Sequence, residues 1–277
     1  MEVAAMLDLD HENIVRLCGW AFEDKTLYII GELVPGGTLY SYVQMAKRND
    51  LRSLGLEKIA LGIAQGLRYL QARKLIHRDL AARNIFLDDD KTPKIGDFRL
   101  CRREGSRYPY GEKPVKWSAP EVLMSRENCS LKSDIWSYGI VLWEVYSLGH
   151  VPFFDIPNAN LSEALEKAFR EGRCPLKFPD YSPKAVHRVG RLCLQKDPAS
   201  RPSSDDIIKN LMTPETPTPS PPPLQAKSPT RPSLPPRTYL RHQTPPLRDP
   251  LSPPPLPPRP PPGYRKHLNA QSIKTVF

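Results

Sequence analysis

The sequence contains few cysteines, and its five are well separated along the chain. None belongs to a CxxC pair or to another spacing typical of zinc ligands, so we expect neither a disulfide scaffold nor a structural metal site. Long apolar runs are also absent. The longest lies around Ile140 to Trp143 and is far too short to cross a bilayer, and no signal peptide opens the chain. We therefore expect a soluble intracellular protein whose thiols are reduced.

The hydrophobic share, 39%, is below that of most globular proteins, whereas proline is in excess. Twenty-one of the 33 prolines follow residue 212. Residues 1–212 alternate apolar and polar positions as a folded protein does. Residues 213–277 cannot build a core, so we expect a disordered segment with much polyproline II conformation.

The formal net charge is +10, and most of it lies in the same proline-rich segment. Residues 213–277 carry nine Lys or Arg against Glu215 and Asp249. A basic tail can contact acidic lipid or nucleic acid. Because these positive charges are spread out and not clustered, we do not expect nucleic acid as a partner.

Hydrophobic periodicity predicts a few strands followed by many helices. Leu56, Ile59 and Ile63 begin an apolar series at helical spacing, which predicts an amphipathic helix over about 53–73. Residues 133–148 are apolar nearly all round, as in a helix buried in the middle of a domain. The order of elements indicates an α+β fold and not a parallel sheet. The other predicted elements are a helix end at 2–9, strands at 14–21, 26–33, 85–87 and 93–96, and helices near 160–171, 182–194 and 203–211.

One loop carries groups suited to phosphoryl transfer. The sequence HRDLAARN spans His77 to Asn84 and lies just before a predicted strand. Asp79 can accept the proton of a substrate hydroxyl, and Asn84 supplies an oxygen ligand for magnesium. Asp97 is a second carboxylate, followed by phenylalanine, that can hold a metal bridging the phosphates. A loop with charges placed by chance is a poor alternative to a match of this length.

These motifs give residues 1–212 a resemblance to the protein tyrosine kinases. Ala81-Ala82-Arg83 within the loop resembles the tyrosine-kinase form. Pro114-Val115-Lys116-Trp117 resembles the substrate platform of that family. The resemblance implies a kinase-like bilobal α+β fold. Its implied parts are a partial N-lobe and hinge at 1–34, a complete and mostly helical C-lobe at 35–212, and the disordered proline-rich tail at 213–277.

The same resemblance assigns roles to single residues. It implies ATP and Mg²⁺ as cofactors and Asp79 as the catalytic base. It also implies two buried supports, a charge pair between Glu121 and Arg201 and hydrogen bonds from the catalytic-loop backbone to Asp134. In the rest of the implied site, Asn84 and Asp97 bind magnesium, and Arg83 and Pro114 position the substrate, with Trp117 as part of the substrate platform. Glu32, Val34 and Phe86 surround the nucleotide.

Two short segments refine the resemblance. Within the tyrosine kinases, residues 2–20 are most similar to the ACK family of cytoplasmic kinases. Gly31 takes the gatekeeper place just before the hinge. A glycine there either leaves an open pocket behind the nucleotide or is an accident of packing.

The beginning of the sequence departs from the family pattern. Glu2 aligns with the helix glutamate that pairs with a strand lysine, yet neither that lysine nor the glycine-rich phosphate loop precedes it. Without them the phosphates lose positioning and charge neutralisation, and the sheet has an exposed strand edge. Either the natural protein is longer, which is the interpretation we adopt, or a short form exists that does not catalyse.

The segment after Asp97 holds a second departure. Arg99 stands where the family has glycine, and arginine lacks the backbone freedom of glycine. This predicts restricted switching between conformations, although neutral drift explains the substitution equally well. Tyr108 and Tyr110 follow as candidate phosphorylation sites with Arg78 as the partner for an added phosphate, or as substrate-side aromatics that are never modified.

The tail contains proline motifs of the kind that small recognition domains bind. PxxPxR occurs at 232–237 and 254–259, and PPxY occurs at 261–264. A polyproline helix docks on aromatic grooves at little entropic cost, and the arginine sets its orientation. About one PxxPxR match is expected by chance at this composition, so two are a moderate signal. The predicted SH3 ligands are Pro232, Pro235, Arg237, Pro254, Pro257 and Arg259, and the predicted WW ligand is Pro261, Pro262 and Tyr264.

Our first hypothesis is therefore a cytoplasmic protein tyrosine kinase that transfers the γ-phosphate of ATP to tyrosine hydroxyls of protein substrates. Its tail would recruit SH3 and WW proteins, which could bring it to the inner membrane face. The alternative is a catalytically inactive truncated kinase or pseudokinase that acts as a scaffold.

Overall fold

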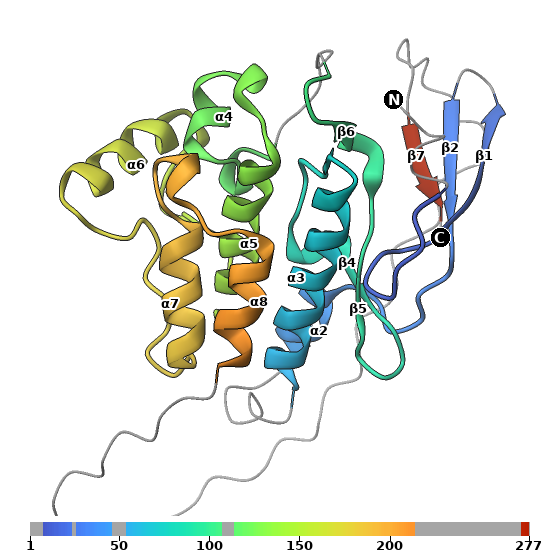
Figure 1. The fold of residues 1–277 in the computed structure, drawn as a ribbon, viewed down its shortest axis with the longest axis horizontal. Helices are drawn as coiled ribbons and strands as arrows, with labels where there is room; N and C mark the ends of the chain where they lie inside the picture. The colour runs from blue at the N-terminus through green and yellow to red at the C-terminus, as the bar shows by residue number, and fades with distance from the viewer. Residues whose placement is uncertain (1–7, 24–25, 46–53, 107–113, 214–272, 277) are drawn as a thin grey trace, which may run out of the picture. The chain divides into compact units, whose positions relative to one another are not determined.

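The computed structural model describes residues 8–23, 26–45, 54–106, 114–213 and 273–276. All of them fall within one of the chain's two structural units, residues 1–215 together with 271–277. Among these residues helices outnumber strands in length, and the strands form one three-stranded and two two-stranded sheets (Figure 1).

The strands lie mostly in the first half of the chain. The larger sheet has the order β1-β2-β7, with β1 and β2 antiparallel and β2 and β7 parallel. The smaller sheets pair β3 with β6 and β4 with β5, both antiparallel. The strands are β1 (Leu17–Glu23), β2 (Thr26–Gly31), β3 (Leu75–Ile76), β4 (Ile85–Leu87), β5 (Pro93–Ile95), β6 (Arg102–Arg103) and β7 (Ile273–Val276).

The helices fill the rest of the described chain. Single 3₁₀ turns connect them, and three such turns matter below: η2 (Ala82–Asn84), η3 (Phe98–Leu100) and η4 (Val115–Trp117). The others are η5 (Arg126–Asn128), η6 (Asn158–Asn160) and η7 (Pro198–Ser200). The α-helices are α2 (Leu39–Met45), α3 (Leu56–Ala72), α4 (Pro120–Met124), α5 (Leu131–Tyr146), α6 (Leu161–Arg170), α7 (Lys184–Cys193) and α8 (Ser204–Met212).

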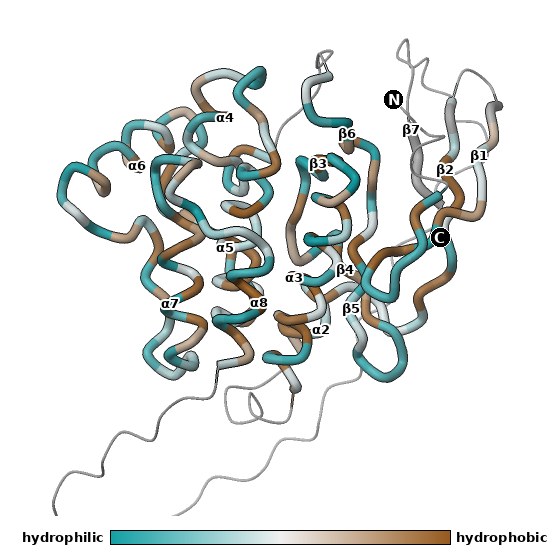
Figure 2. The backbone as a smooth tube through the Cα atoms, viewed as in Figure 1, coloured by the Kyte–Doolittle hydropathy of each residue, from teal (hydrophilic) through white to brown (hydrophobic). Residues whose placement is uncertain are grey.

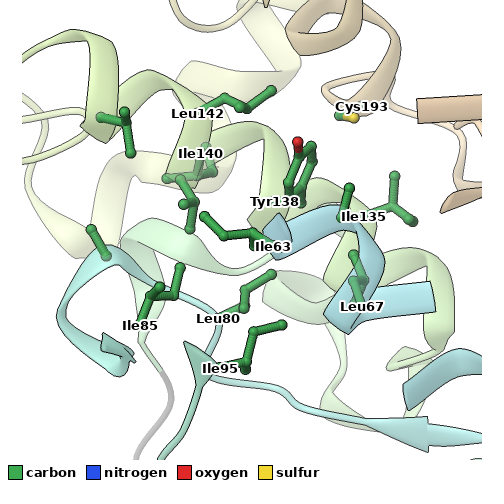
Figure 3. Close-up of a cluster of buried hydrophobic side chains, with 14 of the residues drawn as sticks. Ile63, Leu67, Leu80, Ile85, Ile95, Ile135, Tyr138, Ile140, Leu142 and Cys193 are labelled. Atoms are coloured by element: carbon green, nitrogen blue, oxygen red, sulfur yellow. The ribbon is translucent and has the colours of Figure 1, made fainter. Parts of the chain in front are cut away.

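The core forms around α5, which is buried on nearly every side as its composition predicts. Side chains from α3, α5 and the β4–β5 hairpin meet in this core (Figure 3). The hydroxyl of Tyr138 donates a 2.9 Å hydrogen bond to the Ala60 carbonyl, so the phenol is buried without an unpaired donor. Hydrophobic and hydrophilic positions alternate around α7 (Figure 2), as expected of a helix that packs one stripe against the core.

The helices predicted near 53–73, 133–148, 160–171, 182–194 and 203–211 are confirmed within a few residues at each end, and so are the strands at 85–87 and 93–96. The helix end predicted at 2–9 lies mostly outside the described residues, and its last two residues, 8 and 9, are not helical. The strand predicted at 14–21 is wrong at its start. Ile14 and Val15 pair with Ile95 instead, the Val15 N–H donating to the Ile95 carbonyl at 2.8 Å, so β1 begins at Leu17. The strand predicted at 26–33 ends at Gly31. Helices α2 and α4 and strands β3 and β6 were not predicted because they are too short to show a period.

A buried charge pair joins α4 to the segment before α8, as the family resemblance implies. Arg201 Nη1 and Nη2 each donate to a Glu121 carboxylate oxygen at 2.7 Å. The same guanidinium also bonds the carbonyls of Gln195, Lys132 and Lys196, so all five of its N–H groups have partners. Arg201 is only 2% exposed. Full satisfaction of the donors explains how a charge is tolerated there.

We expect Arg201→Ala to lower the free energy of unfolding by about 3–5 kcal/mol, because Glu121 is left without its charge partner. Urea unfolding of both proteins measures the difference. Arg191→Ala, which removes an exposed arginine of α7, is the matched control. A loss below about 1 kcal/mol, the range of a surface pair, would contradict the structural role of the pair.

The outer edge of β2 is occupied, contrary to the expectation of an exposed edge. Strand β7 pairs with β2 in parallel from Leu27 opposite Ile273 to Ile30 opposite Val276. An unpaired strand edge presents free backbone groups, which a strand from the same chain satisfies. Sequence reasoning missed β7 because four residues after a proline-rich segment carry too little pattern.

We predict that Lys274→Pro/Thr275→Pro frees the β2 edge. Alternate residues of a parallel strand point their N–H groups to one neighbour, so one of these two adjacent prolines must remove a donor that faces β2. Backbone amide exchange at residues 27–30 should then accelerate. Lys274→Arg/Thr275→Val keeps every N–H and should exchange like the parent chain. Equal protection in the proline variant would show that β7 does not cover β2 in solution.

Candidate active site

The loop from His77 to Asn84 is held in place by one buried carboxylate of α5. Asp134 Oδ2 accepts the His77 N–H at 2.6 Å and Oδ1 accepts the Arg78 N–H at 3.0 Å. Arg78 has φ 70°, a left-handed conformation that costs a non-glycine residue energy and persists only where other contacts enforce it. Burial raises the pKa of Asp134, and the backbone N–H groups of His77 and Arg78 and the Arg78 charge oppose that shift. The supporting role predicted for Asp134 is confirmed.

The loop brings the predicted base and its neighbours together. Arg83 Nη2 donates to Asp79 Oδ1, and Asn84 Nδ2 donates to the Asp79 carbonyl at 2.7 Å. The Arg83 guanidinium also lies over the Trp117 ring, 4.4 Å from its centroid. Asp79, Arg83, Asn84 and Trp117 therefore form one connected group, with the Asp79 carboxylate partly buried beside a cation.

Glu144 of α5 accepts hydrogen bonds from this group and from the loop that carries it. We did not predict this residue from the sequence. Its Oε2 accepts the Trp117 indole N–H at 2.8 Å and the Ala82 backbone N–H at 3.0 Å. The residue is 2% exposed. Burial raises its pKa to about 7, and the two hydrogen bonds and the Arg83 charge oppose that shift. The available signal was a carboxylate in the apolar second half of the helix.

His77 connects the loop to the segment that carries Asp97. Its Nδ1 accepts the Asp79 N–H at 3.3 Å, so Nε2 carries the proton and donates to the Gly96 carbonyl at 2.9 Å. The imidazole also packs against the edge of the buried Phe98 ring, with centroids 5.2 Å apart. The His77 side chain therefore links the two backbone segments that carry the carboxylates of the site, Asp79 and Asp97.

Arg99, which stands where the family pattern has glycine, binds both carboxylate oxygens of Asp97. Arg99 Nε donates to Oδ1 and Arg99 Nη2 to Oδ2, each at 2.5 Å. Burial alone would raise the pKa of Asp97, but the guanidinium outweighs burial and holds that pKa below its ordinary value. Asp97 itself has φ 59°, a second strained position in the site.

Gly96 is required by close packing next to Asp97. A Cβ atom at this position would lie 2.8 Å from the Phe86 ring and 3.0 Å from Val15. The predicted nucleotide residue Phe86 is thus packed directly against the segment that presents Asp97, and any larger residue at 96 would move one of them.

The predicted hinge residues follow β2. Glu32 Oε1 accepts the Arg16 N–H at 3.0 Å and the Lys94 ammonium at 2.9 Å. Burial would raise the pKa of Glu32, but these two donors hold it below its ordinary value. Val34 is buried and Leu33 is exposed. The Glu32 N–H also donates to the Arg16 carbonyl at 2.9 Å. The side chain and the N–H of Glu32 are therefore engaged within the protein, which leaves its carbonyl for a ligand.

The predicted substrate platform surrounds η4. The Pro114 carbonyl accepts the N–H groups of Trp117 and Ser118 at 2.9 and 3.1 Å. Pro114 and Arg78 line the same small surface pocket. Tyr108 and Tyr110 lie outside the described residues, so their relation to Arg78 stays a prediction. Glu2 and all the predicted SH3 and WW ligand residues, from Pro232 to Tyr264, also lie outside them.

Asn84 and Asp97 are the two groups that could hold a divalent metal. A carboxylate and a carboxamide are oxygen donors that suit Mg²⁺, which takes its remaining ligands from water and phosphate. The described residues contain no cluster of three or more His, Cys, Asp or Glu able to hold a metal alone. The donors therefore fit a metal that arrives with a nucleotide, although Arg99 already binds the carboxylate.

No helix among the described residues is both long and apolar enough to span a membrane.

We expect Glu144 to make stability depend on pH. Its pKa is about 7 in the folded chain against 4.5 as the ordinary value. The folded state therefore binds the extra proton, and stability falls as pH rises from 4.5 to 7 and levels off above. Glu144→Gln keeps an acceptor for Trp117 and Ala82 but cannot titrate. The difference in unfolding free energy between parent and variant, measured by urea titration, should change across this window. A constant difference would contradict the shifted pKa.

Residues 1–211 match the sequence family described as protein tyrosine and serine/threonine kinase. Megakaryocyte-associated tyrosine-protein kinase of Mus musculus is 39% identical over 210 residues, which cover 76% of this chain and 40% of that protein. Tyrosine-protein kinase csk-1 of Caenorhabditis elegans is 35% identical over 215 residues, covering 76% and 39%. Tyrosine-protein kinase Fer of Rattus norvegicus is 36% identical over 214 residues, covering 76% and 25%. The chain thus spans less than half the length of these relatives.

Proposed function

The chain belongs to the protein tyrosine and serine/threonine kinase family, and from this membership we propose that it transfers the γ-phosphate of ATP to tyrosine hydroxyls of proteins. The observation that carries the proposal is the connected group of Asp79, Arg83, Asn84 and Trp117 on a loop fixed by Asp134. The similar proteins named above are tyrosine-protein kinases, which favours tyrosine over serine or threonine.

In the proposed reaction Asp79 accepts the proton of the substrate hydroxyl as the hydroxyl oxygen attacks the γ-phosphorus. The bond from the γ-phosphorus to its bridging oxygen breaks, and ADP leaves. Arg83 holds the Asp79 carboxylate in one orientation and is itself held by the Trp117 ring. Phosphoryl transfer depends mostly on positioning and on charge stabilisation, and a fixed carboxylate supplies the first. Mg²⁺, when bound with ATP, would neutralise phosphate charge from Asn84 and Asp97.

The remaining predicted residues complete the proposed site. The backbone of Glu32 and Val34 would bind adenine, and Phe86 would lie beside the nucleotide. Pro114, followed by Trp117, would support the substrate tyrosine. Support for this arrangement comes from Glu32, whose side chain and N–H are engaged within the protein, so that its carbonyl is the part able to reach a ligand.

The proposal extends to partners and location. The tail would recruit SH3 and WW proteins through its three motifs between 232 and 264, and partners could bring the chain to the inner membrane face. The five cysteines are free thiols, which agrees with an intracellular, cytoplasmic location. The closer similarity to the ACK subgroup stays a prediction.

An inactive scaffold is the second candidate, because a guanidinium occupies the proposed metal carboxylate. The two candidates differ in whether the chain transfers phosphate at all.

Purified chain should phosphorylate a poly-Glu-Tyr polymer with Mg-ATP, and Asp79→Asn should lower the rate at least about 100-fold, since a positioned base contributes roughly 10²–10⁴. Asp89→Asn, which changes an exposed carboxylate in the β4–β5 turn, is the matched control and should leave the rate unchanged. If the parent chain binds Mg-ATP but transfers no phosphate, the scaffold candidate is supported. Transfer that survives Asp79→Asn would reject Asp79 as the base.

A further inference from the structure

The pair between Arg99 and Asp97 places a fixed cation where the proposed metal would bind. Both carboxylate oxygens of Asp97 accept hydrogen bonds from one guanidinium, a bidentate geometry that is among the strongest available to a carboxylate. The Asp97 side chain is 11% exposed and that of Arg99 is 45% exposed. The carboxylate is therefore enclosed, while the cation that covers it lies toward solvent.

The local backbone keeps this cation in place. Phe98, between the two residues, is anchored in the core against His77. The turn η3 places Arg99 directly after it, and Arg102 Nη1 donates to the carbonyls of Arg99 and Cys101 at 3.3 and 2.5 Å. Because the pair spans only two residues on a fixed turn, little entropy is lost when it forms.

The Arg99 guanidinium binds both oxygens of the Asp97 carboxylate and so offsets its negative charge. A divalent cation at this position would perform the same electrostatic task.

We propose that Arg99 is a built-in counter-ion that competes with a divalent metal for Asp97, so that the metal binds only after the guanidinium has moved away. This rests on the proposed function in taking Asp97 as a metal ligand. The half-exposed Arg99 side chain can leave toward solvent without moving Phe98. The chain should consequently need more divalent metal than it would with an uncharged residue at position 99.

Mn²⁺ binding to the full chain tests the competition, because the electron paramagnetic resonance signal of free Mn²⁺ reports binding without any need for phosphate transfer. Arg99→Gln removes the charge but keeps a long side chain and a non-glycine backbone. We expect Mn²⁺ to bind at least about tenfold more tightly to this variant, the factor that one charge-assisted hydrogen bond represents. If the glutamine variant is poorly folded, Arg99→Gly takes its place, and it should also bind Mn²⁺ more tightly than the parent chain.

Two control variants test whether the change in Mn²⁺ affinity comes from the Arg99–Asp97 pair. Arg173→Gln breaks another pair of the same spacing, between Arg173 and Glu171 on the surface, and should leave Mn²⁺ affinity unchanged. Asp97→Asn added to Arg99→Gln should abolish the gain, because the carboxylate that Arg99 released is then missing. Thermal unfolding of each variant confirms that the comparison is made between folded chains.

The outcomes separate this proposal from the proposed function. Tighter Mn²⁺ binding in Arg99→Gln with no phosphate transfer would support the counter-ion and count against the kinase activity. Unchanged or weaker Mn²⁺ binding by Arg99→Gln, in a chain that does transfer phosphate, would overturn the counter-ion proposal and leave the proposed activity intact. Absence of Mn²⁺ binding in both proteins would overturn the counter-ion together with the metal role of Asp97.

Discussion

The site depends on one buried carboxylate, that of Asp134 at the start of α5. Desolvation of this group is unfavourable, and the backbone N–H groups of His77 and Arg78 offset it. In return the carboxylate fixes a loop whose Arg78 is in a strained left-handed conformation. The positions of Asp79, Arg83 and Asn84 follow from that fixed start, and His77 carries the constraint across to Gly96 and Asp97.

A second buried carboxylate, Glu144, secures the other end of the same loop. Asp134 and Glu144 stand on one helix that is otherwise apolar, so each is an exception within a hydrophobic core. Both accept backbone N–H groups of the loop, and Glu144 also holds Trp117. The buried helix α5 is thus also the element that shapes the site, so loss of the core around it would remove the support of the site.

The sequence was sufficient to predict the catalytic-loop motif, because a match of eight residues is specific. It was sufficient to predict the long helices, because their apolar positions repeat over many residues. It predicted the Asp134 and Glu121–Arg201 contacts only through family resemblance, since neither pair is close in the chain. It could not predict Glu144, β7 or the Arg99–Asp97 pair. The role of Glu144 depends on which residues the helix faces after folding, and β7 depends on the edge of a strand that lies 246 residues earlier in the chain. The orientation of the Arg99 side chain depends on the turn η3, which periodicity does not reveal.

We propose a site for phosphate transfer in which Arg99 covers the carboxylate that the metal needs. A crystal structure of the chain with Mg²⁺ and a non-hydrolysable ATP analogue would show whether the two compete. We expect a metal bound by Asn84 and Asp97, with the Arg99 guanidinium turned away from the carboxylate. A structure in which Arg99 still binds both Asp97 oxygens while the nucleotide carries its metal elsewhere would contradict it.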